Sequence, residues 1–464
     1  MDEMLYNYDV YPKVVRAHNK AVINIAPIGW AAGFDSKKTY AIRIRPTDDG
    51  HYRHYPSRNN DFTQNVTPDD KGALHIEFDF GPEEMYFIDV FEVLDEKRLI
   101  RARVYAVEED LWGRYPFMGD MHMHTARSDG REAPAVVAAN YRKMGLDFLA
   151  ITDHQRYYPS LEAMDAFKDV PIEFNLMPGE EVHLSRQSVS EDYLCDPHIV
   201  NFGGEFSINA LVRGAEHTEE VGEDLSKRAI RTDDVPDCMD ADEFWEMIKE
   251  KAKDITDLEN PEEKVSYACM KWIFDTIRKA NGLGIFAHPY WFSTVRQLPE
   301  EYTEYIMDKQ DFDAFEVCGG ENYFEHNGFQ IVRYYEDKAK GRDYPIVSST
   351  DSHGSLPTNR NRDICKTMVF ARENERKELI ASIKAKYSVA LDTISKEPRY
   401  VGDMRLVRYA CFLGDCFFPL HDELCFEEGR AMREYACGDK FAADELKAIS
   451  GRMKRQREKY FDFG

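Results

Sequence analysis

The N-terminal quarter of the chain contains short segments in which apolar and polar residues alternate. Residues 40–45, 74–80 and 101–107 show this pattern, and the first two segments end at Pro46 and at Gly81-Pro82. A period of two residues, bounded by turn-forming residues, is typical of half-buried β-strands. We therefore predict a small all-β sandwich over residues 1–113.

From residue 115 onward the pattern changes to short apolar runs separated by segments with helical spacing. The runs that predict buried strands cover residues 148–151, 172–176, 197–202, 283–287, 312–317, 345–349 and 387–391. Helical spacing covers residues 133–144, which end before Gly145, and residues 329–340. Apolar runs that alternate with helices predict parallel strands covered on both faces, and therefore an α/β fold.

One stretch, residues 204–280, interrupts this alternation. It is acidic, and residues 241–255 and 262–280 have helical spacing. We interpret it as a solvated helical insertion. The alternative is a lid over a nearby site, because long insertions beside active sites often control access to them.

Composition limits the classes of function. The 464 residues carry a formal net charge of -25, which argues against nucleic acid or an anionic membrane as partner. The 9 cysteines include no Cys-x-x-Cys pair, which favours a reducing compartment. There is no apparent signal peptide and no apolar run of membrane-spanning length, so we expect a cytoplasmic protein. The composition leaves the oligomeric state open.

The sequence His122-Met123-His124, followed by Asp129, is the first candidate metal site. In an extended strand, residues two apart point to the same face, so both imidazoles can face one ion. Ser128-Asp129-Gly130 predicts a turn that returns the carboxylate toward them. Imidazole and carboxylate ligands suit zinc, manganese or iron. Taken alone, His-x-His is a weak signal.

Further histidines and carboxylates follow the predicted strands. The nine candidate metal ligands are His122, His124, Asp129, His154, Glu181, His198, His288, Asp351 and His353. Most of them follow an apolar run, and the carboxyl ends of strands in α/β proteins gather at one edge. Burying so many ionisable groups together is very costly unless cations are bound between them.

These motifs occur in an order that resembles the PHP (polymerase and histidinol phosphatase) family of metal-dependent hydrolases. The resemblance covers roughly residues 115–395 and rests on the motifs His122-Met123-His124 with Ser128-Asp129, Thr152-Asp153-His154, Gly179-Glu180-Glu181-Val182, His198, Ala287-His288-Pro289 and Asp351-Ser352-His353. Gly119-Asp120-Met121-His122 also resembles a branch of that family that includes carbamate and carboxylic-ester hydrolases.

The resemblance implies a distorted seven-stranded (β/α) TIM-like barrel over residues 114–395. We interpret the remaining residues, 396–464, as a mostly helical C-terminal extension packed on the barrel. It also implies two or three divalent ions, zinc, manganese or iron. The first would take His122, His124, Glu181 and Asp351, the second would share Glu181 with His198 and His288, and the third would take Asp129, His154 and His353. Glu180, adjacent to Glu181 on the predicted strand, is expected to face solvent.

The expected activity is hydrolysis of a small, anionic phosphorylated molecule by a hydroxide that bridges the ions. Asp351, His353 and Asp153 are the expected catalytic residues, with Asp153 orienting His154 or a neighbouring ligand. The residues expected to contact the substrate are Arg127, Arg156, Tyr290 and Arg360; Trp291 also follows a metal motif. Two alternatives stay open: a carbamate, carboxylic-ester or amide hydrolase that uses the same ions, and a non-catalytic, metal-loaded binding or regulatory protein.

Overall fold

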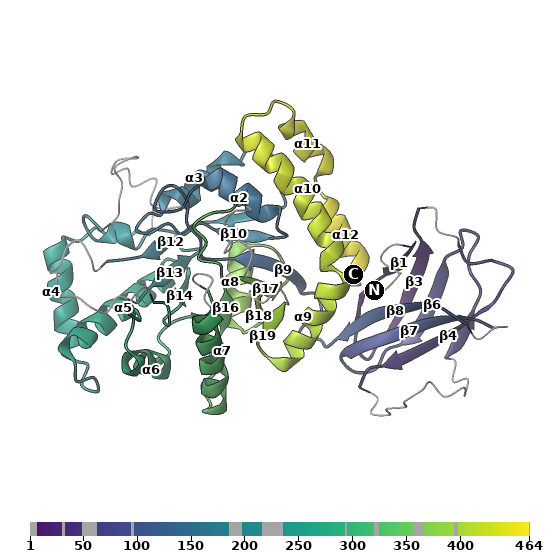
Figure 1. The fold of residues 1–464 in the computed structure, drawn as a ribbon, viewed down its shortest axis with the longest axis horizontal. Helices are drawn as coiled ribbons and strands as arrows, with labels where there is room; N and C mark the ends of the chain where they lie inside the picture. Colours follow the sequence, from purple (N-terminus) through teal and green to yellow (C-terminus); the bar gives the residue numbers. More distant parts are fainter. Residues whose placement is uncertain are drawn as a thin grey trace. The chain divides into compact units, whose positions relative to one another are not determined.

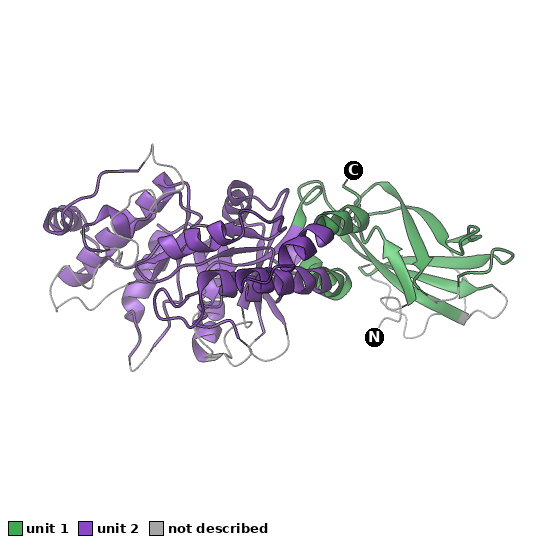
Figure 2. Ribbon diagram, turned by 90° about the horizontal axis from the view of Figure 1, so that it is seen from above, with its two compact units in different colours: residues 1–115, 408–421, 451–464 green, residues 116–407, 422–450 purple. Residues whose placement is uncertain are grey.

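The chain folds into two compact units. The computed structural model describes residues 7–29, 33–48, 63–93, 97–184, 197–215, 235–292, 295–319, 324–356, 365–393 and 398–463. Unit 1 comprises residues 1–115, 408–421 and 451–464, and unit 2 comprises residues 116–407 and 422–450 (Figure 2). The protein is therefore a mixed α/β protein of two units.

Unit 1 is built mainly from two β-sheets that share one core. One sheet has the order β1-β3-β6 and the other the order β2-β8-β7-β4-β5 (Figure 1). The strands are β1 (Tyr8–Tyr11), β2 (Val14–Arg16), β3 (Lys20–Pro27), β4 (Tyr40–Pro46), β5 (Gln64–Val66), β6 (Leu74–Asp79), β7 (Glu84–Glu92) and β8 (Lys97–Val107). In β6, Leu74 and Ile76 are buried while His75 and Glu77 are exposed, so one face packs on the core, as alternation predicts.

Unit 2 contains two mixed sheets, covered by helices. The first has the order β11-β10-β9-β17-β18-β19, with β9 (Tyr115–Asp120), β10 (Phe148–Ala150), β11 (Asn175–Met177), β17 (Cys365–Ala371), β18 (Ser388–Asp392) and β19 (Arg399–Val401). The second has the order β12-β13-β14-β15-β16, with β12 (Gly179–Val182), β13 (Ile199–Phe202), β14 (Leu283–Phe286), β15 (Ala314–Cys318) and β16 (Ile346–Ser348).

The helices between and after these strands complete the fold. They are α2 (Pro134–Arg142), α3 (Tyr158–Ala166), α4 (Ala241–Ala252), α5 (Pro261–Lys279), α6 (Glu300–Lys309), α7 (Phe324–Ala339), α8 (Arg376–Lys384), α9 (Met404–Cys416), α10 (Phe418–Ala436), α11 (Ala442–Ile449) and α12 (Arg452–Tyr460). Within the described residues, no helix has both the length and the apolar character that crossing a membrane requires.

The strand directions correct one expectation. β10 runs parallel to β9, and β14, β15 and β16 run parallel to one another. β13, however, is antiparallel to both β12 and β14, so the prediction that all these strands are parallel is wrong for β13. A fully buried apolar run indicates that a strand lies inside the protein, but it carries no information about the direction of that strand.

Isolated bridges join the edges of the two sheets of unit 2. His154 pairs with Glu181 in parallel, next to β10 and β12. Met123 pairs with Ser352 in parallel, beyond the ends of β9 and β16. The backbone N–H of His124 donates to the carbonyl of Ser352 (2.9 Å), which strengthens the second junction. Candidate ligands therefore lie at both junctions between the sheets.

Helix α5 packs on the second sheet of unit 2. It begins after Asn260, whose side chain caps the helix by accepting from the N–H of Glu262 (3.0 Å), and Pro261 occupies the first turn. Its buried face, including Phe274 and Ile277, joins the core that contains Phe286 of β14. This part of the predicted insertion therefore covers the sheet. The acidic stretch 216–234 lies outside the described residues.

Candidate metal centre

Four of the candidate ligands form the buried centre of the site. The Nε2 atom of His122 lies 3.4 Å from Glu181 Oε2 and 3.3 Å from Asp351 Oδ1. The Nε2 atom of His124 lies 2.9 Å from the same Asp351 oxygen and 3.5 Å from Glu181 Oε2. All four side chains are almost completely buried.

Backbone geometry positions these side chains. β9 leads directly to His122, and the N–H of Asp351 donates to the His122 carbonyl (2.9 Å). The buried Asp120 carboxylate accepts from the backbone N–H (3.1 Å) and the hydroxyl (2.6 Å) of Thr350, which fixes the neighbouring segment. Asp351 has a φ of 47° and His288 a φ of 22°, values that are strained for residues other than glycine and that cluster at functional sites.

His198 and His288 extend this buried centre. His198 Nδ1 lies 2.8 Å from Glu181 Oε1, and His288 Nε2 lies 3.6 Å from Asp351 Oδ2. His198 precedes β13, whereas His288 follows β14. Because β13 is antiparallel, its first residue lies at the edge where its neighbours end. We call the six residues His122, His124, Glu181, His198, His288 and Asp351 the inner group.

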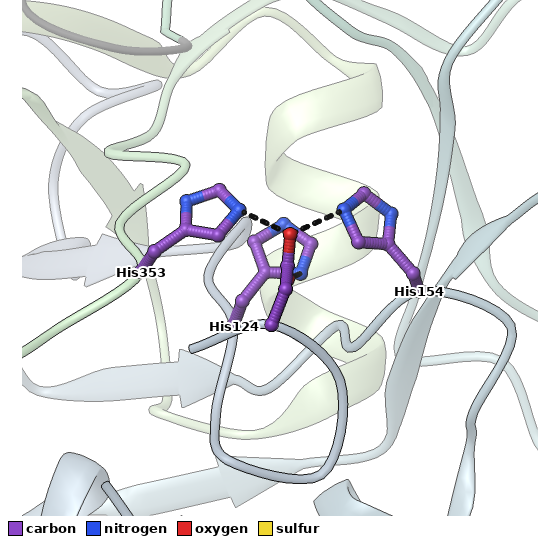
Figure 3. A group of neighbouring side chains, drawn as sticks. His124, His154 and His353 are labelled. Carbon is purple, nitrogen blue, oxygen red and sulfur yellow. Dashed lines mark ion pairs between the residues drawn. The ribbon is translucent and has the colours of Figure 1, made fainter. Parts of the chain in front are cut away.

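Three more candidate ligands, which we call the outer group, lie beside His124. They are Asp129, His154 and His353. Asp129 Oδ2 lies 3.6 Å from His154 Nε2 and 3.2 Å from His353 Nε2, and Figure 3 shows these two imidazoles converging with that of His124. The side chain of Asp129 is 55% exposed, and those of His154 and His353 are about one-third exposed. The outer group therefore faces solvent, and the inner group lies beneath it.

The unpaired buried atoms of the site fit a set of metal ligands. Among the described residues, several buried side-chain atoms have no hydrogen-bond partner: His122 Nε2, His124 Nδ1, both Glu181 oxygens, His198 Nδ1 and both His288 nitrogens. Leaving such atoms unpaired costs about 1–3 kcal/mol each, and neutral imidazoles with carboxylates are the ligands that divalent transition metals take. Multiple buried His, Asp and Glu groups are thus consistent with a polynuclear metal site.

The carboxylates of the site attract positive charge. Burial lowers the pKa of His154, but the carboxylates of Glu181 and Asp129 outweigh that effect and raise it to about 11. Burial likewise lowers the pKa of His353, and Asp129 and Asp351 outweigh it and raise it to about 9. Without metal, protons on histidines would balance the carboxylates. Bound divalent ions would supply the same positive charge and release those protons.

Two other residues predicted to act at the site, Asp153 and Arg127, bind to neighbouring protein groups. Asp153 is buried and accepts from the Thr125 N–H (2.9 Å) and the Ser128 hydroxyl (2.5 Å), so it holds the turn that carries Asp129. Arg127 pairs with Glu162 through two nitrogens (2.8 and 3.1 Å).

Two of the remaining substrate candidates also have partners within the protein. Tyr290 is buried and accepts from Arg333 Nε (3.0 Å). Arg156 is partly buried and has partners within the protein. Arg360 lies outside the described residues.

Glu180 does not face solvent, so that expectation is wrong. Its side chain is completely buried and accepts from the side chains of Asn201 (3.1 Å), Ser207 (2.7 Å) and Asn209 (2.8 Å). Adjacent strand residues point to opposite faces, but the second face of β12 is covered by residues 203–211. Glu180 therefore anchors that loop to β12, while Glu181 points into the site.

Solved structures include proteins of low similarity to this chain. No family model matches the chain, and no curated protein matches it. One neighbour is a Bacteroides vulgatus protein that is described as two-domain and as containing a PHP-like metal-dependent phosphoesterase. The two sequences are 16% identical, and the TM-score is 0.37. The match covers 60% of this chain and 65% of the other chain, which is less than two thirds of its length. The structural neighbours include PHP-like hydrolases.

Two further neighbours are shorter proteins. A Bifidobacterium adolescentis protein described as a metal-dependent phosphoesterase is 20% identical (TM-score 0.31), covering 52% of this chain and 89% of its own. An amidohydrolase from Chromobacterium violaceum is 18% identical (TM-score 0.29), covering 51% and 87%. One neighbour is thus described as containing a PHP-like phosphoesterase, one as a metal-dependent phosphoesterase and one as an amidohydrolase, and the similarity is low in every case.

Sequence reasoning missed two residues of the site. His183 Nε2 lies 3.0 Å from His154 Nδ1 and 3.5 Å from Glu181 Oε2, so it is a further candidate ligand. Glu316, completely buried in β15, lies 3.1 Å from His122 Nδ1 through its Oε2 atom. A signal was present for Glu316, since it is the one charged residue of the apolar run Ala314–Cys318.

The contact between Glu316 and His122 leads to a testable expectation. A carboxylate that binds the second nitrogen of a ligating imidazole fixes its tautomer and raises its basicity, and losing such a partner costs about 10–100-fold in metal affinity. We expect Glu316→Gln to weaken metal binding by about that factor, as measured by competition with a chromogenic chelator. Glu162→Gln, which alters only the partner of Arg127, is the control. Equal affinities for Glu316→Gln and the wild type would show that Glu316 does not orient His122.

Proposed function

We propose that this protein is a metal-dependent hydrolase that cleaves phosphoesters of small molecules. The observation that carries the proposal is the position of the outer group. Asp129, His154 and His353 form a second set of ligands at the solvent-facing side of a buried set, and His124 lies against both. A cation held there would lie where an anionic substrate arrives.

We further propose that seven strands of unit 2 close into a distorted barrel around this site. The strands would follow the order β9, β10, β12, β13, β14, β15 and β16. The bridge between His154 and Glu181 supports contact between β10 and β12, and the bridge between Met123 and Ser352 supports closure of β16 onto β9. In such a barrel, strand ends collect ligands from distant parts of the chain at one face.

The residues of the site have separate roles in this proposal. The inner group would hold two ions, with Glu181 between them, and the outer group would hold a third. When bound, divalent ions supply Lewis acidity and lower the pKa of water to near neutrality. Glu316 and Asp153 keep the ligands in place, and the burial of the inner group excludes bulk water.

The proposal favours phosphoesters because of the number of positive charges. Phosphoryl transfer spreads charge over several oxygens, so additional cations stabilise the transition state itself. Hydrolysis at a single neutral carbonyl places the developing charge on one oxygen, so fewer cations are needed to stabilise its transition state. Arg127 is paired with Glu162, so a cation held by the outer group would supply positive charge to an anionic substrate.

The deciding measurement compares kcat/KM for p-nitrophenyl phosphate and p-nitrophenyl acetate on one metal-replete sample. We expect the phosphate ester to be the better substrate. Because His353 belongs only to the outer group, His353→Ala should lower the phosphatase activity on the order of 10²-fold and lower any esterase activity less. His18→Ala, which changes an exposed histidine of unit 1, should alter neither. Cleavage of the acetate ester alone would disprove the phosphoesterase proposal.

One observation favours a second candidate, a carbamate, ester or amide hydrolase. The indole of Trp291 lies nearly parallel to the His198 ring, with centroids 6.5 Å apart and an interplanar angle of 27°. An aromatic side chain beside the inner group suits an organic group next to a carbonyl. The same paired assay tests this candidate, because Trp291→Ala would then raise KM for the aryl ester.

A further inference from the structure

Unit 1 contains a small cavity that is lined by a buried lysine. The cavity has a volume of about 160 Å³, and Lys13, Tyr8, Asp9, Arg103, Asp415 and Tyr460 are among its lining residues. All of them belong to unit 1. The metal centre lies in unit 2, so this cavity is a separate feature.

Lys13 lies between β1 and β2, and its backbone is fixed by two hydrogen bonds. Its N–H donates to the Tyr460 carbonyl (2.7 Å), and its carbonyl accepts from the N–H of Tyr105 (2.9 Å). The residue is only 6% exposed. The backbone bonds therefore hold this residue in place, and its side chain meets solvent through the cavity that it lines.

The ammonium group of Lys13 forms no ion pair with the described carboxylates, although the charge of Asp9 acts on it. Its nitrogen lies 4.7 Å from the centroid of the Tyr460 ring, and the described residues give it no hydrogen bond and no ion pair. Burial accordingly lowers the pKa of Lys13 from its ordinary value. A cation–π contact offsets the cost of burying an unpaired charge only in part.

The two carboxylates of the cavity are already occupied. Asp9 accepts from the Tyr460 hydroxyl (3.0 Å) and pairs with Lys459. Asp415 pairs with Arg103 Nη1 (2.9 Å). Three cations, Lys13, Lys459 and Arg103, thus stand against two carboxylates, and the excess positive charge falls on Lys13.

The size and lining of the cavity restrict what fits beside that charge. An engineered protein cavity of about 150 Å³ holds benzene, so this cavity has room for a ring of that size. Val10, Ile28 and Leu420 give it apolar walls next to the ammonium group. A ligand that matches both features carries one negative group and a short apolar body.

We propose that this cavity is a binding site for a small organic carboxylate, whose carboxylate pairs with Lys13 and whose apolar part fills the space between Tyr8 and Tyr460. The site is independent of the hydrolase function proposed above. It gives unit 1 a ligand of its own.

Calorimetric titration of the full chain with benzoate, and with benzyl alcohol as the neutral molecule of similar shape, tests this site. Benzoate should bind saturably at one site per chain, and benzyl alcohol at least tenfold more weakly. Lys13→Met keeps the length of the side chain and removes the charge, so it should weaken benzoate binding about 10–100-fold, the equivalent of one charge-assisted hydrogen bond. Lys20→Met, at an exposed lysine of the same unit, should leave it unchanged.

A second measurement on the wild type avoids any effect of Lys13→Met on folding. Reductive methylation followed by peptide mass spectrometry reports the access of reagent to each lysine. Benzoate should protect Lys13 and leave Lys20 equally reactive, whereas benzyl alcohol should protect neither. Equal affinity for the two molecules, absence of saturable benzoate binding, or unprotected Lys13 at saturating benzoate would each overturn the proposal.

Discussion

Replacing Glu181 with glutamine should abolish hydrolysis and release metal. The carboxylate of Glu181 lies within 3.5 Å of five imidazoles: 3.4 Å from His122, 3.5 Å from His124, 2.7 Å from His154, 3.5 Å from His183 and 2.8 Å from His198. An amide keeps the shape of the side chain but lacks the negative charge that would hold two ions. We expect kcat to fall about a thousandfold, the upper range for losing one electrostatic group from a hydrolase.

The adjacent residue provides the matched control. Glu180→Gln makes the same chemical change one position away, on the opposite face of β12. Because the Glu180 carboxylate only accepts hydrogen bonds from residues 201–209, its replacement should lower the free energy of unfolding by about 1–3 kcal/mol and leave the metal content intact. Elemental analysis and chemical denaturation of both variants separate the two effects. Full metal content and activity in Glu181→Gln would exclude Glu181 as a bridging ligand.

Removing the metal should destabilise unit 2 and leave unit 1 unchanged. In the buried inner group, the carboxylates of Glu181 and Asp351 both lie close to His122. Without metal ions, only protonated histidines balance the negative charge of these two carboxylates. A ligand present at 1,000 times its Kd stabilises the folded state by about 4 kcal/mol. We therefore expect a chelator to lower the thermal transition of unit 2 by about 10 °C, given the usual few degrees per kcal/mol.

Differential scanning calorimetry with and without chelator checks this expectation, because a chain with two compact units is not restricted to a single unfolding transition. Adding zinc, manganese or iron back should restore the transition, and Glu181→Gln should respond weakly to the chelator. A single chelator-insensitive transition in the wild type, with no metal by elemental analysis, would contradict the assignment of unit 2 as a metalloprotein.

Short sequence patterns predicted the helices, strands and motifs that depend on residues close together in the sequence. Alternation in residues 74–80 predicted β6, and helical spacing closed by Gly145, with its φ of +88°, predicted α2. Most of the nine candidate ligands lie together because they follow strand ends, and strand ends meet at the edge of a sheet. His122-Met123-His124 could be recognised because two imidazoles in an extended segment share a face.

Other features depend on contacts that the sequence does not encode locally. The direction of β13 is set by pairing with β12 and β14, which a fully apolar run does not specify. Glu180 is buried because a distant loop covers it, and alternation within β12 gives no sign of that loop. Glu316 contacts His122 across 194 positions of sequence, so only the folded chain brings the two together.

The distribution of the ligands along unit 2 has a consequence for biosynthesis. The inner group draws on His122 near the start of the unit and on Asp351, 229 positions later, and these two side chains lie 3.3 Å apart. During translation the ribosome must therefore release almost the whole unit before these ligands can meet. The inner group is therefore complete only after the segment carrying Asp351 has emerged, and a nascent chain that stalls earlier lacks one of its two carboxylates.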